Sequence, residues 1–117
     1  ETGLTSLIEL RLAGNSFTDL SPLRGLITLE YLELTGNDIT DISPLSGLTN
    51  LMALDLRFNP ELTNIQALFE NPGIGAGDIV ELRHTNVSCT EQARLAEKGV
   101  EVRTELFSSC ATATRHR

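Results

Sequence analysis

The sequence is poor in aromatic residues, which make up 4% of its 117 residues and include no tryptophan. A core without large rings must be filled by aliphatic side chains, and hydrophobic residues at 40% are sufficient for one domain. No apolar run approaches the roughly 18 residues of a membrane-spanning helix. We therefore expect one domain with an aliphatic core and no segment inserted in a membrane.

Basic residues are also scarce, since 9 Lys and Arg face 16 Asp and Glu, for a formal net charge of −7. Nucleic-acid binding needs a basic stripe for the phosphates, so we expect no nucleic-acid partner. The charged residues between positions 25 and 56 are all acidic: Glu30, Glu33, Asp38, Asp41 and Asp55. This run favours a basic protein partner, or a cation, over an anionic one.

Cysteine is limited to Cys89 and Cys110, both in the last quarter of the chain. A disulfide between them would close a short loop and stabilise the fold by about 3 kcal/mol through the entropy of the unfolded chain. Disulfides are typical of secreted and cell-surface proteins, so this pairing predicts an extracellular location. The alternative is two unpaired buried thiols in a cytosolic chain.

An internal repeat dominates the first half of the sequence. The stretch TDLSPLRGLITLEYLELTGN at 18–37 returns as TDISPLSGLTNLMALDLRFN at 40–59, a period of 22 residues. A third unit continues the pattern with one extra residue near Pro60. Nine positions of the first unit are matched in the second: Leu7, Leu10, Leu12, Asn15, Phe17, Leu20, Pro22, Leu23 and Leu26. Such a repeat predicts stacked units that share one core.

Each unit combines three local patterns. The alternation in Leu10-Arg11-Leu12 predicts a short strand with its leucines pointing inward. The Asn that follows each strand is expected to bond backbone groups that the turn leaves buried. The Ser-Pro-Leu triplets at 21–23 and 43–45 predict brief helical turns that carry Pro at their first position and are capped by Ser.

The pattern LxxLxLxxN, which occurs three times without exception, resembles the leucine-rich repeat family. The 22-residue unit and the stretch TDISPLSGLTNL are similar to the internalin-type subclass of bacterial surface proteins. The resemblance covers residues 3–69. It implies an α/β fold, a right-handed solenoid with a short parallel sheet on the concave face and 3₁₀ or short helical turns on the convex face.

The rest of the chain is predicted to close the solenoid. Repeats occupy residues 1–69, an irregular fourth strand and a C-terminal cap occupy 70–110, and 111–117 form a flexible tail. The cap resembles that of secreted bacterial leucine-rich repeat proteins. Ser88 and Glu91 form a capping-box pattern, which predicts a helix over about 89–98 that ends at Gly99, with an extended segment at 100–107.

The Gly-rich stretch GIGAG at 73–77 is expected to form a loop that flexes out of the solenoid. It lacks the Lys-Ser/Thr pair of a phosphate-binding loop, and no helix of adequate length follows it directly. At the other end, Thr2-Gly3-Leu4-Thr5 aligns with the middle of the next unit. We therefore expect the chain to be a monomeric, C-terminal fragment of a larger repeat protein.

Binding residues are expected on the concave face, as the resemblance implies, and the strand pattern identifies the outward positions. The candidates are Tyr31, Glu33, Asp55, Arg57, Phe58, Arg83 and His84. Exposed aromatic and arginine side chains are what interface hot spots are made of. Parallel strands lie about 4.8 Å apart, so Phe58 and His84 are expected side by side. The alternative is local packing of Tyr31 and Phe58.

Metal binding and catalysis have little support in the sequence. Glu33, Asp55 and Glu81 would stack on successive strands and resemble a Ca²⁺ site, but neighbouring arginines are expected to neutralise them. Histidine is limited to His84 and His116, and no oxyanion hole or orienting group accompanies them. We expect no metal, no cofactor and no enzymatic activity.

The sequence thus predicts a secreted or surface-displayed module that recognises a protein through its concave face. The alternative is a structural capping segment of a longer repeat protein whose binding surface lies upstream. Fold resemblance by itself does not identify the partner.

Overall fold

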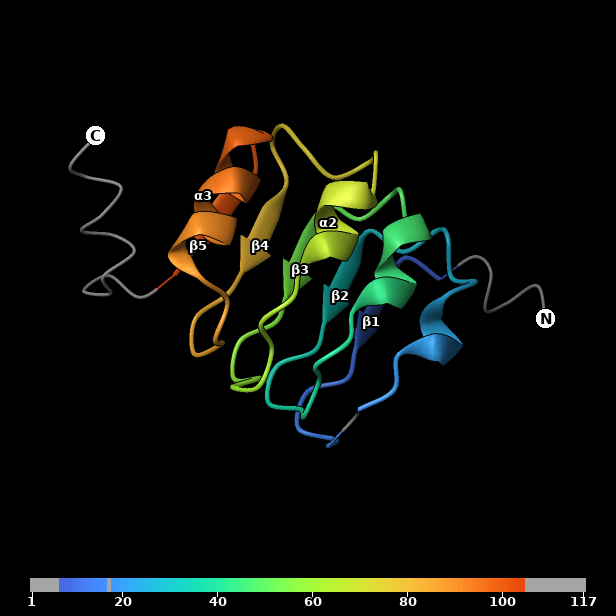
Figure 1. The fold of residues 1–117 in the computed structure, drawn as a ribbon. Coiled ribbons are helices and arrows are strands. Elements are labelled where there is room, and N and C mark those ends of the chain that lie inside the picture. The colour runs from blue at the N-terminus through green and yellow to red at the C-terminus, as the bar shows by residue number, and fades with distance from the viewer. Residues whose placement is uncertain (1–6, 17, 105–117) are drawn as a thin grey trace.

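The computed structural model describes residues 7–16 and 18–104. Cys110, the tail predicted at 111–117 and the end of the extended segment predicted at 100–107 lie outside these residues. The described chain winds into a coil in which strands line one side and helices the other (Figure 1). This arrangement confirms the α/β solenoid that the repeat predicts.

Five short parallel strands form one sheet in chain order: β1 (Glu9–Arg11), β2 (Tyr31–Glu33), β3 (Ala53–Asp55), β4 (Ile79–Glu81) and β5 (Glu101–Arg103). The register pairs Leu10 with Leu32 and Leu32 with Leu54, so equivalent positions of successive units lie beside each other. β4 and β5 extend the same register with Val80 and Val102. The sequence repeat therefore sets the strand pairing directly.

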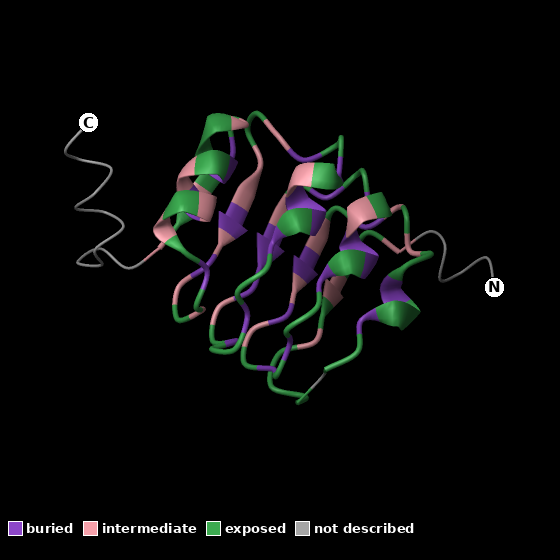
Figure 2. Ribbon diagram, viewed as in Figure 1, coloured by how far each residue is buried: buried purple, intermediate pink, exposed green. Residues whose placement is uncertain are grey.

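The helices all lie on one side of the sheet (Figure 1). They are the 3₁₀ helices η1 (Ser21–Leu23) and η2 (Ser43–Gly47) and the α-helices α2 (Gln66–Glu70) and α3 (Cys89–Glu97). Three of them, η1, η2 and α2, are short and fit the predicted helical turns. Figure 2 shows that buried residues line the strands and the helix sides that face them.

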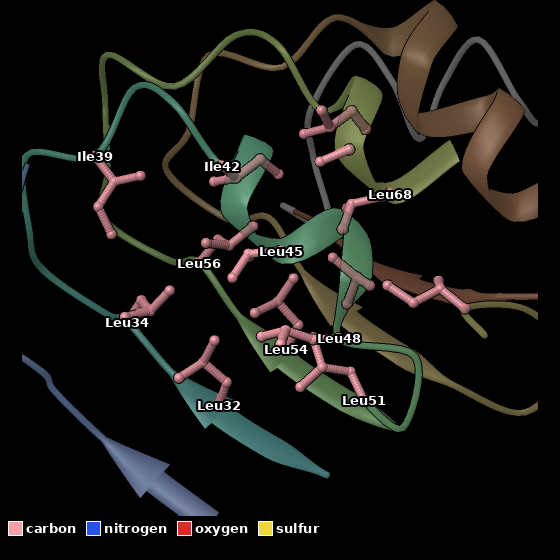
Figure 3. Packing of buried hydrophobic residues seen from close by; sticks show 14 of the residues in the cluster. Leu32, Leu34, Ile39, Ile42, Leu45, Leu48, Leu51, Leu54, Leu56 and Leu68 are labelled. Carbon is pink, nitrogen blue, oxygen red and sulfur yellow. The ribbon is translucent and has the colours of Figure 1, made fainter. Parts of the chain in front are cut away.

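The core between sheet and helices is aliphatic, as the lack of aromatic residues predicts. Its largest fully buried side chains are leucines and isoleucines of the repeat, among them Leu32, Leu34, Ile42, Leu45 and Leu54. In Figure 3, Leu32 of β2 and Leu54 of β3 point toward the segment that carries Leu45 and Leu48. No single unit encloses its own leucines, so stability comes from stacking.

The predicted bonding of the turn asparagines is confirmed at Asn37. Its amide nitrogen donates to the carbonyls of Leu12 in the preceding unit and Leu34 in its own unit, both at 3.0 Å. Its side-chain oxygen accepts from the backbone N–H of Asn15 at 2.9 Å. One side chain thus satisfies backbone groups of two units and holds them together.

Asn59 repeats this arrangement one unit later. Its amide nitrogen donates to the carbonyls of Leu34 and Leu56 at 3.0 and 2.9 Å, and its oxygen accepts from Ile39 N–H at 3.2 Å. In the fourth unit Thr85 takes the position, and its hydroxyl donates to the carbonyl of Leu82 in the same unit. Asn37 and Asn59, which we call the asparagine ladder, therefore link the regular units. Beside the cap, the local bond of Thr85 replaces the ladder.

The prediction that Ser caps the 3₁₀ helices is wrong. The residue before Ser21 or Ser43 occupies the cap position, and no cap side chain bonds the helix there. The N-terminus is held from one residue earlier, because Asp19 Oδ1 accepts from the backbone N–H of Ser21 and Asp41 Oδ1 from that of Ser43, both at 2.9 Å. Each N–H thus donates to a charged acceptor, and such a hydrogen bond is stronger than one to a neutral hydroxyl.

The loop at 73–77 does not flex out of the solenoid, contrary to the sequence-based expectation. Ile74 is buried in the main core, and Asn71 just before the loop is fully buried. The Asn71 amide donates to the carbonyl of Leu45 in η2 at 2.9 Å and to that of Leu48, just beyond η2, at 3.0 Å. Burial of Ile74 and the Asn71 hydrogen bonds therefore hold this loop against the end of the second unit.

The predicted C-terminal cap is confirmed in its helix and strand. Ser88 Oγ accepts from the backbone N–H of Glu91 at 3.2 Å at the start of α3, and Gly99 takes a positive φ of 95° just beyond its end. Cys89 is the first residue of α3. Because Cys110 lies outside the described residues, the disulfide stays a prediction.

Candidate binding surface

The seven predicted binding residues lie on or beside one face of the sheet, opposite the helices, which we call the open face. Tyr31 and Glu33 belong to β2 and Asp55 to β3, while the other four lie two or three residues beyond the ends of β3 and β4. The parallel register brings Glu33, Asp55 and Glu81 into one row. This row is the predicted stack of carboxylates.

Arginines neutralise these carboxylates, as the sequence predicts. Arg57 donates from Nη2 to Asp55 Oδ2 at 2.7 Å and from Nε to Oδ1 at 3.0 Å. Arg83 donates from Nη2 to Glu81 Oε1 at 2.8 Å. The carboxylates are more deeply buried than the guanidinium groups that bond them. The Asp55 and Glu81 side chains are 7% and 12% exposed, against 32% and 40% for Arg57 and Arg83.

Arg103 also reaches this row, although the sequence reading did not select it. It follows Glu81 in the strand register and bonds Glu81 Oε2 at 3.4 Å and Glu101 Oε2 at 2.9 Å. The signal was present in the sequence, because Glu101-Val102-Arg103 lies 22 residues after Ile79-Val80-Glu81 and repeats the spacing of Glu9-Leu10-Arg11. The predicted extended segment thus supplies the fifth strand of the open face.

A hollow of about 250 Å³ lies at the middle of the open face. Ala53 leaves it open, because its column holds the larger Tyr31 on β2 and Ile79 on β4. The residues that line the hollow are Tyr31, Ala53, Leu54, Asp55, Arg57, Ile79, Glu81 and Arg103. One part of its lining is therefore apolar, and the other part is formed by the ion pairs of Asp55 and Glu81 with their arginines.

Phe58 and His84 form a stacked pair at the edge of the open face, as predicted. Their ring centroids are 4.4 Å apart with an interplanar angle of 17°. Both residues take the left-handed conformation with φ of 60°, while glycines with φ of 68° and 71° occupy this position in the first two units. Bulky residues are rare at such φ values, so Phe58 and His84 occupy positions at which the backbone favours glycine.

Tyr31 packs locally, in line with the alternative that the sequence left open. The guanidinium of Arg11 lies over its ring, 4.9 Å from the centroid. Burial, reinforced by the charge of Glu33, raises the pKa of the Tyr31 hydroxyl above its ordinary value of 10.0. The ring still forms one wall of the hollow.

The pKa of Asp55 depends on its arginine partner. Burial opposes ionisation of the carboxyl, but hydrogen bonds from the side chain and the backbone N–H of Arg57 outweigh it and hold the pKa below the ordinary 3.8. A group with a lowered folded pKa stabilises the fold above its unfolded pKa, and the contribution disappears as the pH falls through the folded pKa.

We therefore expect Asp55→Asn to weaken the acid dependence of stability below about pH 4. The measurement is the urea midpoint of wild type and variant from neutral to strongly acidic pH. The wild-type midpoint should fall more steeply in the acid range, because Asp55 must be protonated there. Parallel curves would contradict the assigned role of the Asp55–Arg57 pair.

Within residues 7–16 and 18–104, no group of three His, Cys, Asp or Glu side chains is placed to hold a metal ion. The same residues include no helix long and apolar enough to cross a membrane. The chemistry that the open face does offer is that of an interaction surface: an apolar hollow, paired charges and a ring pair.

Comparison with known proteins identifies repeat proteins. Residues 27–70 match a family model described as Leucine Rich repeats (2 copies). Internalin C2 from Listeria monocytogenes is 30% identical, with a TM-score of 0.69, over 88% of this chain and 44% of the internalin chain. An internalin (inlF) from the same organism is 26% identical, with a TM-score of 0.58, over 90% of this chain and 38% of its own. The chain spans less than half the length of either, and no curated protein sequence matches it.

Proposed function

Because the chain is a leucine-rich repeat protein similar to the internalins, we propose that it binds a protein partner through the open face of its sheet. Leucine-rich repeat proteins are generally protein-interaction modules and are typically not enzymes. The open face corresponds to the concave face of the sequence prediction. We further propose that the protein acts outside the cell, secreted or at a cell surface.

The observation that carries this proposal is the Phe58–His84 pair. A left-handed backbone costs an L-residue about 1–2 kcal/mol, and glycine avoids this cost in the first two units. Stacking of the two rings returns about 0.5–1.5 kcal/mol, and 49% of Phe58 remains exposed. The pair therefore adds little to stability, and a partner that covers these rings gives a reason for their presence.

We expect Phe58→Gly to leave the free energy of unfolding within about 1 kcal/mol of wild type and to abolish partner binding. Relief of the left-handed strain offsets the lost stacking and the backbone entropy of glycine. A core phenylalanine would lose about 3–5 kcal/mol on truncation. Urea denaturation measures the stability, and differential capture from cell-surface and extracellular protein extracts, quantified by mass spectrometry, measures binding.

The matched control is the double variant Gln66→Ala/Glu70→Ala, which changes exposed residues of α2 on the opposite side of the coil. It should retain every partner that the wild type captures. Equal capture by wild type and Phe58→Gly would contradict the proposal, as would a loss that the α2 variant shares.

A second role, that of a structural cap, has one specific observation in its favour: the C-terminal part bonds the end of α2. Lys98 Nζ donates to the carbonyls of Leu68 and Asn71 at 2.8 and 3.2 Å, which satisfies the end of α2 from the cap. As a capping segment of a longer repeat protein, the chain would stabilise repeats whose binding surface lies elsewhere. Binding that is insensitive to open-face variants in the longer protein would favour this role.

A further inference from the structure

The net charge of −7 suggests a basic partner, but the geometry of the open face points to the opposite chemistry. We infer that the open face binds an acidic protein segment. This segment inserts an aromatic or large aliphatic side chain into the hollow over Ala53 and places carboxylates on the arginines of the rim. The inference rests on the proposed function and specifies the partner.

The acidic side chains of the hollow have little capacity left for a partner cation. Both oxygens of Asp55 accept from Arg57. One oxygen of Glu81 accepts from Arg83 and the other from Arg103. A lysine or arginine of a partner would have to displace a guanidinium that already bonds each carboxylate at close range. Displacement exchanges one ion pair for another and yields little net affinity.

The arginines, by contrast, keep unused donors. A guanidinium has five N–H donors in a rigid fork. Arg57 and Arg83 bond their carboxylates through Nε and Nη2, and Arg103 uses Nε and Nη1. Within the described part of the chain, nothing accepts from Arg57 Nη1, Arg83 Nη1 or Arg103 Nη2. These oriented donors match the acceptor geometry of carboxylates.

The hollow itself has the size of a side-chain site. Its volume of about 250 Å³ lies below the range of about 300–1,000 Å³ that is usual for small-molecule pockets. The Tyr31 ring, Ala53 and Ile79 give it apolar walls, and such pockets hold the aromatic anchors of protein interfaces. A partner segment with an apolar side chain beside carboxylates therefore fills the hollow and accepts hydrogen bonds from the arginines of its rim.

The overall charge does not prevent this mode of binding. The open face carries five acids and four arginines (Glu9, Glu33, Asp55, Glu81 and Glu101; Arg11, Arg57, Arg83 and Arg103), so its formal charge is −1 against −7 for the chain. Charges elsewhere are screened over about 8 Å at physiological salt. Contacts at hydrogen-bond distance on the open face are screened much less.

The experiment is selection from a phage-displayed library of random peptides on immobilised wild type, Ala53→Trp and Ala13→Trp. Ala53→Trp fills the hollow. Ala13→Trp makes the same change just beyond β1, outside the hollow, and thermal unfolding verifies that both variants fold. We expect the wild type to enrich peptides with Asp or Glu beside an aromatic or large aliphatic residue. These should bind Ala53→Trp at least about tenfold more weakly and Ala13→Trp unchanged.

Enrichment of Lys- or Arg-rich peptides that Ala53→Trp loses would overturn the acidic class but retain recognition through the open face. Acidic peptides that bind Ala53→Trp as well as wild type would overturn the hollow as their site. A selection that enriches no peptide would overturn the inference altogether. The capture experiment with Phe58→Gly tests the proposed function separately from all three outcomes.

Discussion

Asn59→Ala is expected to lower the free energy of unfolding by about 3 kcal/mol, because it removes the side chain that links the second and third units. Asn59 is fully buried, and its loss leaves the carbonyls of Leu34 and Leu56 without this donor and the N–H of Ile39 without its acceptor. A buried polar group that loses its partner costs about 1–3 kcal/mol. A small domain has only about 5–15 kcal/mol in total, so urea denaturation will resolve the change.

Asn15→Ala is the matched control at the same position of the first unit. Asn15 is exposed, and its amide donates only to Ala13 O, at 3.1 Å, within the described residues. We expect a loss of about 0.5–1 kcal/mol there, the usual net value of one hydrogen bond. If the two variants lost similar amounts of unfolding free energy, burial of the asparagine would not determine its contribution to stability.

Gly73→Ala is expected to destabilise the fold by about 3 kcal/mol, at the upper end of the range for overpacking. A Cβ atom at this position would lie 1.9 Å from the carbonyl oxygen of Thr49 and 2.6 Å from its carbonyl carbon. Both are backbone atoms beside the end of η2, so they cannot rotate away as a flexible side chain would. The loop that follows α2 would have to separate from the end of the second unit, which would expose Ile74.

Gly47→Ala is the control for this prediction. A Cβ atom at residue 47 would meet nothing within 4 Å, and the residue lies in η2. The substitution should be neutral or should stabilise by about 0.4–1 kcal/mol, since alanine reduces the entropy of the unfolded chain. Thermal and urea unfolding of the two variants give the comparison. A small effect at residue 73 would mean that the loop is not bound to the solenoid.

The candidate site shows how far a repeated sequence predicts a surface. The stacking of Phe58 on His84 and the row of Glu33, Asp55 and Glu81 follow from the strand register alone. The pairing of these carboxylates with arginines was also expected, but its consequence for the partner was not. The acidic run between residues 25 and 56 suggested a basic partner, whereas the folded open face covers its central carboxylates with arginines. The outer guanidinium donors of these arginines have no acceptor within residues 7–16 and 18–104.

The sequence by itself determined the strands, their order and register, the aliphatic core and the asparagine ladder. The physical reason is that equivalent positions of successive units become neighbours in space, so one periodic pattern specifies all of these contacts. Contacts that do not follow the period were decided only by the tertiary structure. They include Gly73 against Thr49 and Lys98 on the end of α2. These depend on how an irregular loop and the cap pack on the last regular turn, which no local pattern encodes.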